Sequence, residues 1–96
     1  MDLASFTATL KETAPPEGLD RPLASLWYVA KGDWDRAHTL AQEEKNRTGA
    51  WVHAHLHRVE GDLSNAAYWY GQAKRTPSTA SLKAEWEEIA AALLAR

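Results

Sequence analysis

Two related stretches of sequence decide the fold: KGDWDRAHTLAQ, residues 31–42, and EGDLSNAAYWYGQA, residues 60–73. They align at an offset of 29 residues, with identities at Gly32/Gly61, Asp33/Asp62 and Ala37/Ala66. Glycine takes the left-handed conformation that ends one helix, aspartate caps the next helix, and a small alanine lets the paired helices approach closely. The repeat therefore predicts two helix-turn-helix hairpins.

The rest of the chain also has apolar residues at helical spacing, and no segment alternates as a β-strand would. A chain of 96 residues is long enough for one modest core. We expect a single all-α domain of five to six helices, namely an N-terminal helix over 1–14, a first hairpin over 21–46, a second hairpin over 49–75 and a capping helix over 79–96. The apolar stripe of the last helix, from Leu82 to Leu94, should cover the helix that holds Tyr70 or be shared in a dimer.

Charge and composition argue against several classes of function. Eleven basic and thirteen acidic residues give a net charge of −2, and no basic run is longer than Lys74-Arg75, so a nucleic-acid partner is not expected. No apolar stretch is long enough for a membrane helix, so no membrane partner is expected. The chain has no cysteine, which excludes disulfides and fits a reducing compartment. A cytoplasmic location is the expectation.

The second hairpin carries a family pattern. The pattern is a glycine-acidic-aromatic turn followed by alanine, aromatic, alanine and proline. In the second hairpin it is matched in order by Gly61, Asp62, Leu63, Ala66, Tyr70, Ala73 and Pro77. Two positions depart from it: Leu63 replaces the aromatic residue of the turn, and Pro77 comes one residue early. The first hairpin matches at Gly32, Asp33, Trp34 and Ala37, and departs at Ala41 and Glu44. These residues resemble the tetratricopeptide-repeat family over about residues 22–78, although that family's unit is longer, at about 34 residues. The resemblance implies a helical scaffold that binds proteins or peptides and catalyses no reaction.

The stretch WVHAHLHRVEGD, residues 51–62, places histidines at every second position. By the resemblance, His53 and His57 occupy positions that pack against the partner helix of the same hairpin, while His55 points to a different side. The favoured interpretation is that His53 and His57 are hydrogen-bonded packing residues, and no cofactor is expected.

The same spacing allows an alternative interpretation as a metal site. His53 and His57 are four residues apart and share a helix face, so both could bind zinc or another transition metal. Glu60 lies further along that face, and His38 could approach from the preceding helix. Ala54 follows His53, so the HExxH motif and its general base are missing.

No other motif indicates catalysis, and the protein is not expected to be an enzyme. The aromatic residues point instead to binding, because tryptophan and tyrosine dominate protein interfaces. Trp69 is expected to pack near Trp86. The alternative is that Trp51, Tyr68 or Trp69 is partly exposed and anchors a protein, a peptide or a second copy of the chain, and His55 is a further candidate binding residue. The favoured function is a non-catalytic interaction or self-association module, and a small metal- or ligand-binding protein is the alternative.

Overall fold

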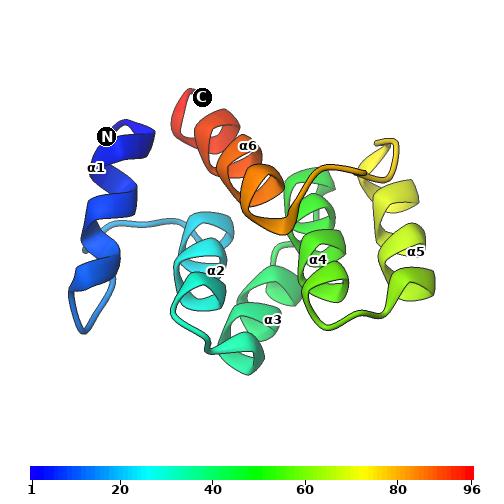
Figure 1. Ribbon diagram of the computed structural model, residues 1–96, viewed down its shortest axis with the longest axis horizontal. Helices are drawn as coiled ribbons and strands as arrows, with labels where there is room; N and C mark the ends of the chain where they lie inside the picture. The colour runs from blue at the N-terminus through cyan, green and yellow to red at the C-terminus, as the bar shows by residue number, and fades with distance from the viewer.

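The computed structural model describes residues 1–96 and contains only helices, connected by turns and loops (Figure 1). The helices are α1 (Leu3–Ala8), which continues into a 3₁₀ turn (Thr9–Lys11), α2 (Arg21–Ala30), α3 (Trp34–Glu43), α4 (Arg47–Val59), α5 (Leu63–Ala73) and α6 (Leu82–Leu94). The predicted all-α class with five to six helices is confirmed. None of these helices combines the length and the apolar character needed to cross a membrane.

The two glycine-aspartate turns form as the repeat predicts. Gly32 and Gly61 have φ angles of +87° and +85°, in the left-handed region that favours glycine. Asp33 and Asp62 then accept hydrogen bonds from the first turns of α3 and α5. Each turn therefore joins two helices that pack on each other, α2 with α3 and α4 with α5.

Helix α4 lies at the centre of the fold and packs against α2, α3, α5 and α6. Its residues from Gly49 to His57 are all buried. A helix surrounded on all sides has no solvated face, so its polar residues must find partners in the neighbouring helices. This position explains why histidines two residues apart meet different parts of the structure.

Helix α4 begins earlier than the sequence predicted. The second hairpin was expected to start at residue 49, but Asn46 caps the helix by accepting a hydrogen bond from Gly49 N at 2.9 Å, so α4 starts at Arg47. Gly49 therefore lies inside the helix, in its first turn. A Cβ atom added at Gly49 would lie 2.0 Å from the carbonyl oxygen of Glu44, so glycine is needed for this close approach.

Helix α6 does not cover the helix that holds Tyr70, and its residues Trp86, Ile89 and Leu93 are buried within the single chain, so neither form of that prediction holds. It crosses back over α4 and α2 to reach α1 (Figure 1). The Trp86 indole stacks on Phe6 with ring centroids 5.7 Å apart, and its Nε1 donates a hydrogen bond to the Leu26 carbonyl at 2.8 Å. Trp86 therefore fixes α6 against the N-terminal half of the chain, because in this position its ring has a stacking partner and its N–H has a hydrogen-bond acceptor.

Candidate metal centre

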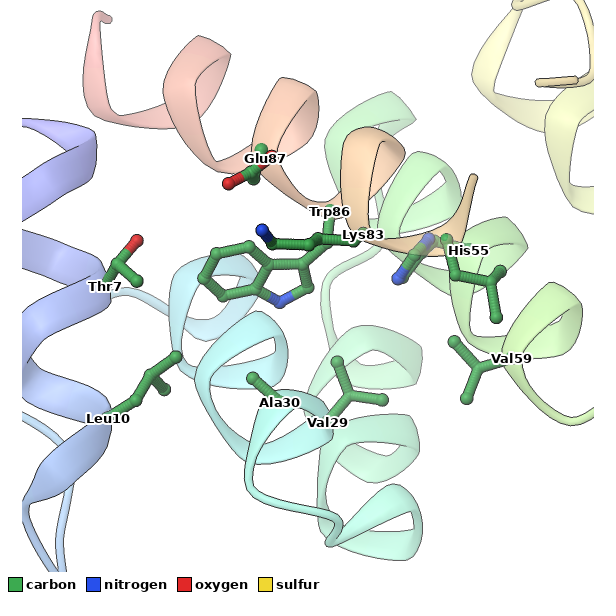
Figure 2. Close-up of a pocket in the computed structure, with 10 residues that line it drawn as sticks. Thr7, Leu10, Val29, Ala30, His55, Val59, Lys83, Trp86 and Glu87 are labelled. Carbon is green, nitrogen blue, oxygen red and sulfur yellow. The ribbon is translucent and has the colours of Figure 1, made fainter. Parts of the chain in front are cut away.

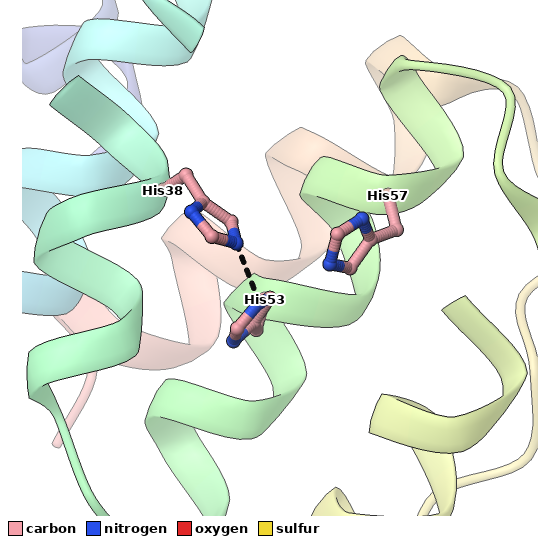
Figure 3. A group of neighbouring side chains, drawn as sticks. All are labelled: His38, His53 and His57. Carbon is pink, nitrogen blue, oxygen red and sulfur yellow. Dashed lines mark hydrogen bonds between the residues drawn. The ribbon is translucent and has the colours of Figure 1, made fainter. Parts of the chain in front are cut away.

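Three histidines from two neighbouring helices converge between α3 and α4 (Figure 3). His53 and His57 are one turn apart on α4, and His38 faces them from α3. The ring nitrogens that could act as ligands lie within 4.8 Å of one another. The group contains the residues that the alternative interpretation of the sequence named as metal ligands, except for Glu60.

The distance between His38 and His53 is close to that of two ligands on one metal ion. Their Nε2 atoms are 2.9 Å apart, which is a hydrogen bond if one ring donates and the other accepts. Two imidazole nitrogens bound to a tetrahedral zinc ion at about 2.0–2.1 Å are separated by about 3.3 Å. The two nitrogens would have to separate by roughly 0.4 Å to reach this ligand spacing.

Glu60 contacts the Nδ1 atom of His57 and is not a member of the group formed by His38, His53 and His57. His57 Nδ1 donates to Glu60 Oε2 at 2.6 Å, which leaves Nε2 on the other side of the ring. His57 Nε2 has no hydrogen-bond partner. Every fully buried polar side-chain atom of the protein does have a partner, so His57 Nε2 is not fully buried and can be reached by a ligand. A carboxylate that fixes the tautomer of a histidine is the usual outer partner of a histidine metal ligand. Glu60 is thus placed to orient a ligand, which differs from the direct role considered from the sequence.

The surroundings keep two of the three rings neutral at physiological pH. Burial, followed by the nearby His38 and His57 rings, lowers the pKa of His53 to about 4. Burial and His57 also lower the pKa of His38 below its usual value. Neutral imidazoles have the free lone pair that metal binding requires.

Two indoles enclose the histidine cluster. Trp69 stacks on His53 with ring centroids 3.9 Å apart, and Trp34 stacks on His38 with centroids 4.7 Å apart. Trp34 is itself fixed by a hydrogen bond of 2.8 Å from its Nε1 to the Leu56 carbonyl. The rings are therefore held in place before any ligand binds, which reduces the entropy lost on binding.

A second group of potential ligands shares His57 and includes Glu60 and Asp62. Both carboxylates are exposed, and Asp62 already serves as the N-cap of α5 by accepting from Asn65 N at 3.2 Å. Because these acidic groups are solvated and one has a structural role, this group is the weaker of the two.

The structure changes the interpretation of the four aromatic and histidine anchors. Trp51 and His55 are only 6% and 2% exposed, so the expectation that they are open to a partner is wrong. The Arg75 guanidinium covers the Trp51 ring at 3.3 Å from its centroid. Trp69 is partly buried against His53 instead of lying near Trp86, which corrects a further expectation. Tyr68 is 57% exposed and remains available.

The sequence analysis missed a second polar cluster on the other side of α4, centred on Glu85 of α6. Glu85 is 1% exposed and accepts hydrogen bonds from His55 Nδ1 and Arg58 Nη1, each at 2.7 Å, and from the Tyr70 hydroxyl. A signal for it was present, because Glu85 lies four residues before Ile89 and eight before Leu93, within the apolar stripe. A carboxylate at such a position must have buried partners.

Comparison with family models, curated proteins and solved structures finds no match to this chain. The resemblance to tetratricopeptide repeats thus stays a prediction, and function must be argued from the chain's own residues.

Proposed function

We propose that this protein binds a transition metal ion, with zinc as the expected ion, through His38, His53 and His57. One observation carries the proposal: three histidine side chains converge within 4.8 Å, and one of them is oriented by a carboxylate. Three imidazoles with a fourth position for water or another ligand form a common zinc donor set. Packing alone does not require three histidines to meet, since the tetratricopeptide pattern has apolar or aromatic residues at two of these positions.

Metal content tests the proposal directly. Protein purified without a histidine tag, stripped with a chelator and dialysed against zinc should retain one zinc ion per chain by elemental analysis. Cobalt should bind with the visible absorption of a tetrahedral site. Zinc should also raise the melting temperature, because an ion that binds only the folded state stabilises it by about 2.7 kcal/mol at a concentration of 100 times Kd.

Matched variants locate the ion. Phenylalanine at His38, His53 or His57 keeps a ring of similar size, and each of these three substitutions should abolish tight binding. Glu60→Gln should weaken affinity by about tenfold, the usual effect of losing an outer carboxylate. His55→Gln removes a histidine from the opposite side of the same helix and should leave the cobalt absorption unchanged. Zinc uptake that persists in all three phenylalanine variants would overturn the proposal.

A second candidate function, self-association, is favoured by the exposed face of α5. Helix α6 does not pack along α5, and Leu63 and Tyr68 of α5 are 68% and 57% exposed. We propose a second copy of the chain as the occupant, in keeping with a tetratricopeptide-like scaffold in a reducing, cytoplasmic setting. Sedimentation equilibrium should give a dimer that Leu63→Ser and Tyr68→Ser dissociate. A monomer at all concentrations would reject this candidate. Neither proposal includes a catalysed reaction.

A further inference from the structure

An apolar pocket lies between α1, α2 and α6, beside the end of α4 (Figure 2). Its volume is about 330 Å³, near the lower end of the range for pockets that bind small molecules. The apolar part of its wall consists of Leu10, Val29, Ala30, Val59, Leu82 and Trp86. Val59 and Leu82 are 38% and 41% exposed, so the pocket opens to solvent through apolar side chains.

His55 supplies a buried polar atom to this pocket. The residue is 2% exposed and lines the pocket, and Figure 2 places its ring at one end of the cavity. His55 Nδ1 faces the Glu85 carboxylate at 2.7 Å, while Nε2 forms no hydrogen bond within the protein. Every fully buried polar side-chain atom of the protein has a hydrogen-bond partner, so Nε2, which has none, is not fully buried. The open space next to His55 is the pocket that this residue lines.

The Glu85 cluster determines which nitrogen of His55 carries the proton. Burial alone would raise the pKa of Glu85, but the hydrogen bonds from His55, Tyr70 and Arg58 outweigh it and lower this pKa. Glu85 is therefore ionised at neutral pH and accepts from all its partners. Because Nδ1 faces the Glu85 carboxylate, the uncharged tautomer of His55 that fits this contact has its proton on Nδ1 and a lone pair on Nε2, and in that form the ring offers the pocket a hydrogen-bond acceptor.

We propose that the pocket binds a small, largely apolar molecule with one hydroxyl group, such as a phenol, whose O–H donates to His55 Nε2. The six apolar residues favour an apolar body, while the polar lining residues Thr7, Lys83 and Glu87 include one side chain of each charge, so the lining as a whole does not select an ion of either sign. A carboxylate would bring its own lone pairs against that of Nε2.

This site is separate from the histidine cluster. His55 lies about 200° around the helix from both His53 and His57, and its contacts are with α6 and not with α3. The ligand proposal therefore does not rest on the metal proposal, and either can fail without the other.

Two probes that differ in a single donor test the hydrogen bond. p-Cresol should bind wild-type protein at least about fivefold more tightly than 4-methylanisole, in which a methyl group replaces the hydrogen of the O–H. In long-range ¹H–¹⁵N spectra, p-cresol should shift the His55 Nε2 resonance and leave those of His38, His53 and His57 in place. Equal affinity for the two probes, or no shift of Nε2 at millimolar p-cresol, would overturn the proposal.

Variants locate the probe within the pocket. Ala30 is exposed at the wall of the pocket, so Ala30→Leu should fold normally, reduce the free volume and abolish p-cresol binding. Ala91→Leu adds the same bulk at an exposed position of α6 outside the pocket and should bind p-cresol as wild type does. His55→Phe should remove the preference for p-cresol over 4-methylanisole. Unchanged p-cresol affinity in Ala30→Leu, or a dimer that Ala30→Leu dissociates, would assign the pocket to another occupant and reject the proposal.

Discussion

Trp69 lies flat against His53, with ring centroids 3.9 Å apart and an interplanar angle of 13°. The stack brings a residue of α5 onto the face of α4 that carries the histidine cluster. It also covers one face of the His53 ring, so burial of this imidazole depends on a neighbouring helix. The indole consequently contributes both to the stability of the α4–α5 hairpin and to the protonation state of His53.

Trp69→Ala should destabilise the protein by about 2 kcal/mol, because a large, partly buried ring and its stacking partner are lost together. Tyr68→Ala removes the adjacent, 57% exposed ring and should cost no more than about 0.5 kcal/mol. Urea unfolding of the two variants measures the difference. Equal losses in the free energy of unfolding would show that stacking of Trp69 on His53 adds no stability.

Acid should destabilise the protein through His53 before carboxylates begin to titrate. The pKa of His53 is about 4 in the folded protein, below its ordinary value of 6.5. The unfolded chain therefore binds the proton first, and stability is full above the ordinary pKa and falls as the pH drops below it. Between about pH 7.5 and about pH 5, the expected loss from this residue is about 2 kcal/mol.

The control for this acid effect is His53→Phe, which keeps an aromatic ring against Trp69 but cannot be protonated. Its free energy of unfolding, measured in urea at each pH in chelated buffer, should fall less steeply than that of the wild type. Part of the slope should remain, because the pKa of His38 is also lowered. Parallel curves for the two proteins would contradict the proposed origin of the acid sensitivity.

Most of the helical architecture could be predicted from the sequence because its signals are local. The turns at Gly32 and Gly61 are specified by residues that adopt the required conformation by themselves. The path of α6 is not local, since it depends on Trp86 meeting Phe6 and the Leu26 carbonyl, which are far away in the sequence. A stripe of apolar residues shows that α6 is buried on one side but does not identify the helices that cover it.

The candidate site was partly predictable for the same reason. The spacing of His53 and His57 places them on one helix face, whereas the approach of His38 depends on how α3 packs on α4. Whether Glu60 would coordinate an ion or orient His57 could not be decided from spacing, because both roles need a carboxylate in the same region. The contact between Glu60 Oε2 and His57 Nδ1 favours the orienting role.

Glu85→Gln should destabilise the protein by about 3 kcal/mol, since it removes the charge that holds buried donors from His55, Arg58 and Tyr70. The amide also presents its own N–H groups to these donors. Glu88→Gln makes the same change at an exposed position of α6 and should alter stability by less than about 0.5 kcal/mol. Thermal and urea unfolding should separate the two variants. Similar stabilities would show that the Glu85 cluster contributes little net free energy.

Two glycines within helices should respond in opposite directions to the same substitution. Gly71 of α5 is exposed and has no atom within 4 Å of the position of an added Cβ, so Gly71→Ala should stabilise the helix by about 0.5–1 kcal/mol. At Gly49 the added Cβ would lie 2.0 Å from the Glu44 carbonyl oxygen and 2.8 Å from the Glu44 Cβ. The helix start or the end of α3 must then move, and Gly49→Ala should cost about 2 kcal/mol or more despite the better helix propensity of alanine. Urea midpoints that rise for both variants would show that α3 and α4 can separate at this junction without loss of stability.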